Sequence, residues 1–170
     1  MIRAAIIGAS GYSGSQLMRL ISLRDDISLT KVIAGASVGQ RVDALYPVFS
    51  GVLDLEFESL ENNHLDGLDV AFVALPSGEA MKTVPSLLQK VERTIDMSGD
   101  FRLMSAELYE QFYRHPHSAP ELLPYAVYGL PELNREAIGS ARLVANPGCY
   151  PTCTILALLP ALAADVISPT

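Results

Sequence analysis

The chain has 170 residues, a formal net charge of −7, 49% hydrophobic and 18% charged residues. This length can bury roughly 70% of its unfolded surface, and the acidic balance excludes a nucleic-acid scaffold, which would carry a basic stripe. Two cysteines are too few for a disulfide framework, and no apolar segment is long enough for a membrane span. We therefore expect a cytoplasmic protein that binds neither nucleic acid nor membrane.

Apolar runs with strand character alternate with segments of helical periodicity along the chain. Strands are predicted at residues 2–7, 29–34, 53–57 (the weakest), 69–75, 93–97, 126–128 and 143–145. Helices are predicted at residues 13–23, 79–91, 105–112, 131–138 and 152–164, and a proline-rich loop at 115–124. This order predicts an α/β fold, a Rossmann-like doubly wound parallel sheet whose ligands bind at the carboxyl ends of the strands.

A glycine turn follows the first strand and opens the first helix, with the spacing G-x-x-G-x-x-G over residues 8–14. Gly8 permits a tight turn, Gly11 lets the backbone approach a pyrophosphate, and Gly14 lets helix and strand pack closely. The helix N-terminus offers N–H groups to phosphates. The alternative is a glycine-rich turn without a ligand. The predicted cofactor contacts in this turn are Gly8, Ser10, Gly11, Tyr12, Ser13 and Gly14.

The segment after the second strand bears on the choice of cofactor. NAD sites usually place an acidic residue there for the ribose hydroxyl, and residues 34–41 contain none. Ser37 can donate to a phosphate and Arg41 can neutralise one, which favours NADP. The competing interpretation is a solvent loop with an incidental arginine.

Cys149 lies between a buried strand and a helix, in the segment Asn146-Pro147-Gly148-Cys149. A helix N-terminus stabilises a thiolate, so Cys149 is a candidate nucleophile; the alternative is a buried structural cysteine. Cys153, one turn later in an apolar run, is expected to pack in the core. No histidine or carboxylate pair has ligand spacing with these cysteines, so no metal site is predicted.

Other polar residues allow two interpretations each. Asp100 and Arg102 follow a strand end and either line the crevice, with Arg102 meeting an anionic substrate, or form an internal ion pair. His115 and His117 either act as a general base or pack in their loop. His64, in a polar stretch, is expected to be solvated.

Four segments together resemble the N-acetyl-γ-glutamyl-phosphate reductases of arginine biosynthesis, over nearly the whole chain. They are residues 8–14 (GASGYSG), 98–103 (SGDFRL), 128–133 (YGLPEL) and 146–152 (NPGCYPT). The resemblance implies an enzyme in which the Cys149 thiolate displaces phosphate from a small acyl phosphate, giving a thioester that NADPH reduces to an aldehyde. It extends the cofactor contacts to Leu75, Pro76, Ser77, Ser98 and Gly99, and the substrate contacts to Arg102 and Asn146.

The resemblance also implies a division of the chain. Residues 1–148 would form the NADP-binding domain, and residues 149–170 the catalytic helix leading to a second α+β domain. That domain, which would follow Thr170, would carry a catalytic histidine, much of the substrate site and the interface of a homo-oligomer. Two positions depart from the family: Val38 follows Ser37 where an arginine is usual, and Ser77 stands where a histidine is common.

Three alternatives remain open at this stage. The related reductase of lysine biosynthesis acts on an aminoadipyl phosphate. Aspartate-semialdehyde dehydrogenase shares the chemistry, although its cysteine segment differs from residues 147–150. The third alternative, from another class, is an inactive nucleotide-binding module.

Overall fold

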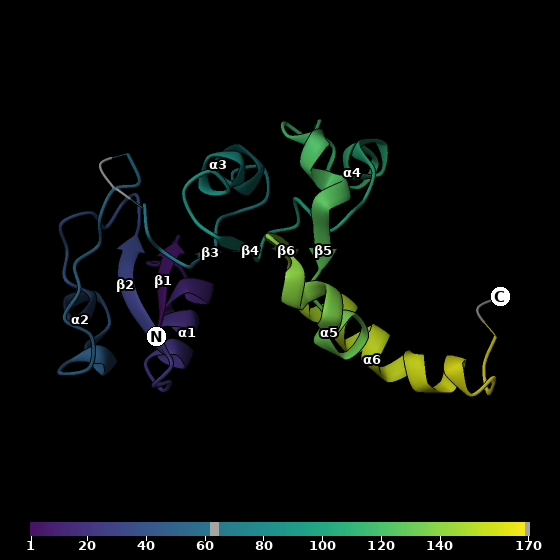
Figure 1. Ribbon diagram of the computed structural model, residues 1–170, viewed down its shortest axis with the longest axis horizontal. Helices are drawn as coiled ribbons and strands as arrows, with labels where there is room; N and C mark the ends of the chain where they lie inside the picture. Colours follow the sequence, from purple (N-terminus) through teal and green to yellow (C-terminus); the bar gives the residue numbers. More distant parts are fainter. Residues whose placement is uncertain (62–64, 169–170) are drawn as a thin grey trace.

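A computed structural model describes residues 1–61 and 65–168. Its centre is a parallel six-stranded sheet in the order β2-β1-β3-β4-β6-β5 (Figure 1). The strands are β1 (Ile2–Ile7), β2 (Ile27–Ile33), β3 (Val70–Val73), β4 (Arg93–Asp96), β5 (Ala126–Tyr128) and β6 (Leu143–Ala145). The α-helices are α1 (Tyr12–Ile21), α2 (Val42–Leu45), α3 (Ala80–Leu87), α4 (Ala106–Tyr113), α5 (Pro131–Ser140) and α6 (Cys149–Ala163); short 3₁₀ helices are η1 (Pro47–Phe49) and η2 (Pro120–Tyr125). The predicted doubly wound class is confirmed.

Helices cover both faces of the sheet, with α3 and α4 on one side and α1 and α5 on the other (Figure 1). The two hydrophobic clusters follow from this layering. In β1, Ala5 and Ile7 belong to the cluster beneath α3, whereas Ile6 belongs to the cluster beneath α1. A strand covered on both faces needs an unbroken apolar run, which is what the sequence of β1 supplies.

The strand order reverses beside β1, because β2 lies on one side of it and β3 on the other. In a doubly wound sheet, this switch point opens a crevice at the carboxyl ends of the strands. The glycine turn after β1 therefore enters α1 at the edge where a ligand would bind.

The strand predicted at residues 53–57 is wrong. The segment makes only isolated bridges, Arg41 with Glu56 and Ile33 with Glu58. Its backbone bonds are divided between two partners: the Phe57 carbonyl accepts from Gly39 N–H, whereas Glu58 N–H donates to the Val32 carbonyl. The alternating pattern therefore reflects the burial of Phe57, but the segment forms no continuous hydrogen-bonded strand pairing.

Several element boundaries also differ from prediction. Helix α3 ends at Leu87 rather than at residue 91, since Lys90 N–H bonds back only three residues, to the Leu87 carbonyl. The loop predicted at residues 115–124 contains most of η2. The predicted cap of α4 is confirmed, because the Ser105 hydroxyl accepts from Leu108 N–H at 3.2 Å.

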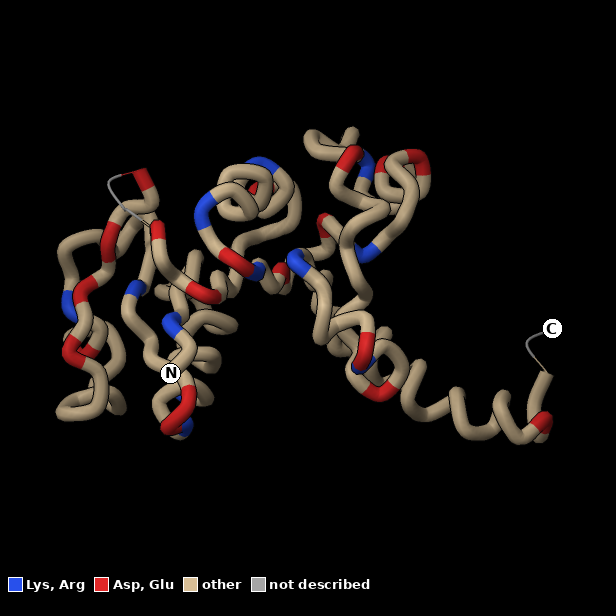
Figure 2. Tube along the Cα trace, viewed as in Figure 1, with Lys and Arg blue, Asp and Glu red and all other residues tan. Residues whose placement is uncertain are grey.

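Helix α6 projects away from the sheet and buries none of its residues (Figure 1). Figure 2 shows no charged residue along it, and its sequence contains none. The prediction that Cys153 packs in the core is wrong: Cys153 is exposed, because no described element covers this helix. Within the described residues, α6 and the other helices are too short or too polar to cross a membrane.

Candidate active site

The turn after β1 is built so closely that two of its glycines have no room for a side chain. Gly8 has φ +86°, in the left-handed region, and a Cβ there would clash with the Ala74 carbonyl. A Cβ on Gly14 would clash with the Gly8 carbonyl and the Ala9 backbone. At Gly11, by contrast, a Cβ would approach only the Gly8 carbonyl, at 3.4 Å. The turn is therefore packed against the protein at Gly8 and Gly14 and open at Gly11.

Within the described part of the chain, no side chain bonds to the first-turn N–H groups at the N-terminus of α1. Gly11 is the N-cap and provides no capping side chain. The next residue, Tyr12, is 83% exposed, and Ser13 is exposed beside it. Unpartnered N–H groups at a helix start suit a phosphate, so this turn fits the pyrophosphate of a dinucleotide.

A hollow of about 290 Å³ lies against this turn, at the carboxyl ends of β1, β2 and β3. Its lining consists of Ile7, Gly8, Ile33, Ala34, Gly35, Ser59, Leu60, Glu61 and Leu75. Two predicted cofactor contacts, Gly8 and Leu75, line it. Glu61 is an acidic lining residue that the sequence analysis missed, because it lies far along the chain from β2 and reaches the hollow through the loop that follows residue 58.

Arg41, the predicted partner of a 2′-phosphate, is held by two carboxylates. Its Nε donates to Asp43 and its Nη1 to Asp54, at 2.9 and 2.8 Å. Hydrogen bonds to Asp43 and Asp54 raise the pKa of Arg41 further above its usual range. The predicted partner Ser37 is half-buried, and its carbonyl accepts from Gln40 N–H.

A hydrogen bond between two predicted cofactor contacts joins the turns after β3 and β4. Gly99 N–H donates to the Ser77 hydroxyl at 3.1 Å. A Cβ on Gly99 would clash with the Tyr113 hydroxyl, so a larger residue there would force the Tyr113 ring to move. The residues predicted from different segments, Ser77, Ser98 and Gly99, therefore meet at one edge of the sheet.

The turn after β4 is organised by two buried carboxylates that the sequence analysis left ambiguous or unmentioned. Asp96 accepts from Ser98 N–H at 3.0 Å and from the Ser98 hydroxyl at 2.7 Å, and burial raises the pKa of Asp96 to about 6. Asp100 accepts from the N–H groups of Gly78 and Met81, each at 2.9 Å. Asp100 therefore caps α3 from a neighbouring turn.

Tyr109 provides a third donor to Asp100, with its hydroxyl at 2.8 Å from the carboxylate. Burial, followed by this hydrogen bond, raises the pKa of Tyr109 above its usual value. The Asp100–Arg102 ion pair considered from the sequence does not form in the described structure. Arg102 instead donates from Nε to the Asn146 carbonyl at 2.8 Å and from Nη2 to the Met97 carbonyl at 2.9 Å.

Cys149 is the first residue of α6 and is exposed. The position predicted for it, at a helix N-terminus directly after a buried strand, is confirmed. Gly148 is the N-cap and supplies no capping side chain. Asn146 N–H donates to the Asp96 carbonyl at 2.7 Å, which continues the β4–β6 pairing to the edge of the thiol's own loop.

Both described histidines pack in their loop. The Nε2 of His117 donates to the Asp100 carbonyl at 2.9 Å while its Nδ1 accepts from Ala119 N–H at 3.1 Å. This pattern requires the neutral ring, and burial lowers the pKa of His117. His115 lies 3.4 Å from the Tyr109 hydroxyl. His64 lies outside the described residues.

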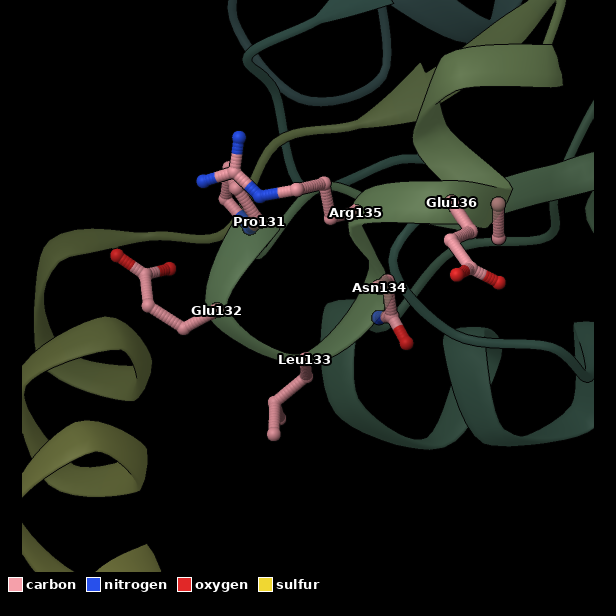
Figure 3. Close-up of a pocket in the computed structure, with 7 residues that line it drawn as sticks. Pro131, Glu132, Leu133, Asn134, Arg135 and Glu136 are labelled. Carbon is pink, nitrogen blue, oxygen red and sulfur yellow. The ribbon is translucent and has the colours of Figure 1, made fainter.

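A larger hollow, of about 580 Å³, is lined by residues 131–137 of α5 alone (Figure 3). The side chains in Figure 3 point in several directions, and none belongs to a predicted site residue. We therefore assign the ligand crevice to the smaller hollow beside the glycine turn. Among the described residues, no three histidine, cysteine or carboxylate side chains gather as a metal site would require.

A doubly wound parallel sheet, with a glycine turn entering its first helix and a thiol at the start of its last, has the architecture of a dinucleotide-binding domain of an oxidoreductase. The family model described as the NAD-binding domain of semialdehyde dehydrogenase matches residues 3–141. The chain belongs to this family, and its cofactor is a nicotinamide dinucleotide. The resemblance stated from the four motifs is thereby confirmed at the level of the family.

A curated relative from Laribacter hongkongensis, named N-acetyl-gamma-glutamyl-phosphate reductase, is 44% identical over 99% of this chain and 49% of its own. The chain thus spans about half the length of that relative. Among solved structures, aspartate semialdehyde dehydrogenase II of Vibrio cholerae, complexed with ASA, superposes with a TM-score of 0.72 at 21% identity, covering 96% of this chain and 47% of its own. The Candida albicans enzyme, solved with NADP, gives 0.61 at 12% identity, covering 97% and 47%. These two likenesses show the shared fold.

Proposed function

We propose that this chain is the cofactor-binding and thiol-bearing part of an NADPH-dependent N-acetyl-γ-glutamyl-phosphate reductase, an enzyme of arginine biosynthesis. The observation that carries the proposal is the exposed thiol of Cys149, at the start of a helix and at the ligand-binding edge of the sheet. The relatives at about half coverage support the choice of substrate. The activity belongs to the whole protein.

Cys149 is the proposed nucleophile. Its thiolate attacks the carbonyl carbon of the acyl phosphate: a C–S bond forms, the C–O bond to phosphate breaks, and inorganic phosphate leaves with the electron pair. NADPH supplies the hydride that reduces the resulting thioester. The C–S bond then breaks, which releases the aldehyde and returns the Cys149 thiolate. The helix N-terminus favours the anionic sulfur at the start and end of this sequence.

The cofactor would lie along the edge from α1 to β4. The glycine turn, with Ser10, Tyr12 and Ser13, would hold the pyrophosphate. The rest of the cofactor would contact the turn after β3, at Leu75, Pro76 and Ser77, and then the turn after β4, at Ser98 and Gly99. Ser37 and Arg41 favour NADPH over NADH, although Arg41 shares its charge with Asp43 and Asp54. Glu61 faces the same hollow and would oppose an added phosphate.

Arg102 and Asn146 are the proposed substrate contacts. Two nitrogens of Arg102 are already bonded to carbonyls, and its Nη1 makes no hydrogen bond within the described residues. A cationic nitrogen beside the thiol's loop suits the phosphate of the substrate.

We further propose that residues 1–148 form the cofactor domain and that residues 149–170 lead into a second domain. The apolar, uncharged surface of α6 supports this division, because a helix of this composition is normally buried. That second domain would hold the catalytic histidine and the interface of a homo-oligomer. We assign the protein to the cytoplasm, where both thiols stay reduced.

The direct test is Cys149→Ser in the full-length protein. We expect it to bind NADPH as the parent does and to lose phosphate-dependent oxidation of N-acetylglutamate semialdehyde by more than about 10³-fold, because the serine hydroxyl is a far weaker nucleophile. Cys153→Ser, one turn along the same helix, is the matched control and should stay active. Retained activity in Cys149→Ser, or a preference for aspartate semialdehyde in the parent, would contradict the proposal.

A further inference from the structure

Arg102 joins two turns that lie far apart in the sequence. Its Nε donates to the carbonyl of Asn146, in the loop that carries Cys149, and its Nη2 donates to the carbonyl of Met97, at the end of β4. The side chain is partly buried. A planar guanidinium that bonds two carbonyls in fixed directions holds them at a fixed separation. Arg102 therefore ties the loop before Cys149 to the sheet.

The third nitrogen of Arg102 lies against Gly148, directly before Cys149. A Cβ built on Gly148 would be 3.1 Å from Nη1 and 3.7 Å from Cζ of Arg102. The backbone of Gly148, with φ −74° and ψ 164°, is open to any residue. A Cβ at this position would therefore press against the guanidinium, although the backbone conformation itself would accept any residue.

The guanidinium also adds positive charge at the N-terminus of α6. The positive charge of Arg102 lowers the pKa of Asp96, whereas burial raises it. Both the helix end and the arginine favour an anion at the start of α6, where Cys149 lies.

We propose that Arg102 is a positioning residue for the thiol: by joining the carbonyls of Met97 and Asn146 beside Gly148, it sets the place and the reactivity of Cys149. The catalytic meaning of this role rests on the proposed function. The structural role is independent of the proposed function, because it concerns only the position and reactivity of the thiol. It also differs from the proposed contact between Nη1 and the substrate.

Arg142 provides a matched comparison at the opposite end of β6. It also donates to backbone carbonyls, to Leu88, Val91 and Glu92 around the end of α3. Arg142 therefore links segments through backbone carbonyls as Arg102 does, but at the amino end of the strand, remote from the cysteine. Loss of either arginine should lower stability, and only loss of Arg102 should change the reactivity of Cys149.

The experiment is a double-mutant cycle on Arg102→Ala and Gly148→Ala, read out as the rate of iodoacetamide alkylation of each cysteine by peptide mapping. The full-length protein is used, without substrate or cofactor, so the result is independent of whether the proposed reaction occurs. Cys153, on the same helix, is the internal reference: loosening of the whole helix would move both rates, whereas the proposal concerns their ratio.

We expect Arg102→Ala and Gly148→Ala each to lower the Cys149 rate relative to Cys153 by about tenfold. In the double variant, Gly148→Ala should add nothing, because the guanidinium that the new Cβ displaces is gone. Arg142→Ala should leave the ratio unchanged. Should Arg102→Ala not fold, Gly148→Ala and Arg102→Lys carry the test.

Arg102→Lys separates position from charge, because lysine keeps the charge and lacks the rigid fork. We expect it to lower the ratio too, although by less than Arg102→Ala does, because the charge remains while the two fixed hydrogen bonds are lost. An unchanged ratio in Arg102→Ala, multiplying effects in the double variant, or a parental ratio in Arg102→Lys would each overturn the proposal.

Discussion

The two ends of the candidate site are built in different ways. The turn that faces the cofactor is shaped by backbone: Gly8 and Gly14 pack with no space for a Cβ. The turns around the thiol are shaped by side chains: Asp100 and Arg102 bond to neighbouring loops, and Asp96 bonds to Ser98 within its own turn. A glycine permits a tight turn without any partner from a distant segment, whereas a side chain can link two turns only when both have reached their folded positions. The two ends should therefore fail differently when mutated.

The largest effect is expected at the cofactor end. Gly8→Ala places a side chain at a positive φ and against the Ala74 carbonyl, so we expect a loss of about 3 kcal/mol in the free energy of unfolding together with loss of cofactor binding. Denaturant titration and calorimetry measure the two. The control is Gly139→Ala, a helical glycine with nothing within 4 Å, which should be neutral or slightly stabilising. A Gly8→Ala variant as stable as the parent would refute the backbone account.

The next effect belongs to the thiol end. Asp100→Ala leaves the N–H groups of Gly78 and Met81 and the Tyr109 hydroxyl without their acceptor, so we expect a loss of about 2 to 3 kcal/mol in the free energy of unfolding. Hydrogen exchange should show the first turn of α3 opening more often. The exposed Asp66 offers the control, Asp66→Ala. If the first turn of α3 stays as protected as in the parent, Asp100 is not its cap.

A pH dependence should follow from Asp96. Its pKa is raised to about 6 by burial, whereas an unfolded aspartate titrates near 3.9. Between these values the folded state binds more protons than the unfolded state, so this residue contributes stability at low pH that is lost as the pH rises from about 4 to about 6. The expected size is about 1 to 3 kcal/mol.

In Asp96→Asn this contribution should vanish. Unfolding free energies measured by denaturant titration from pH 4 to 7 should show a smaller fall with rising pH in the variant than in the parent. The hydrogen bonds to Ser98 change as well, so the comparison uses the slope with pH rather than the absolute value. Parallel curves for variant and parent would rule out the buried carboxyl as the source.

The smallest effect is expected at Arg41. Since Asp43 and Asp54 already hold its guanidinium at the surface, Arg41→Gln should lower the preference for NADPH over NADH by only about threefold. Val38→Arg, which restores the arginine common in the family at an exposed position, should raise that preference. Calorimetric titration with both cofactors provides the measure. If Arg41→Gln abolishes the preference, the carboxylates do not weaken Arg41 as described.

The contrast between the two ends also explains which parts of the site could be predicted. The glycine turn and a helix start beside Cys149 are local patterns, and both appear in the structure, although α6 begins at Cys149 rather than at the predicted residue 152. Asp100 and Arg102 were ambiguous, because their partners lie on other turns and no local pattern names them. Asp96 went unnoticed although its side-chain partner, Ser98, is only two residues away. The strand predicted at residues 53–57 failed for a related reason: alternation marks a buried face but does not supply a neighbouring strand along its length.

The sequence by itself determined the six strands of the sheet and the five longer helices, the glycine turn and the position of the thiol, since each depends on residues close together in the chain. Only the tertiary structure decided that Asp100 caps a helix instead of pairing with Arg102, that Arg102 ties the Cys149 loop to β4, and that Cys153 is exposed. Those outcomes depend on which turns meet at the sheet edge and on what covers α6, and such contacts arise only when segments distant in the chain are brought together.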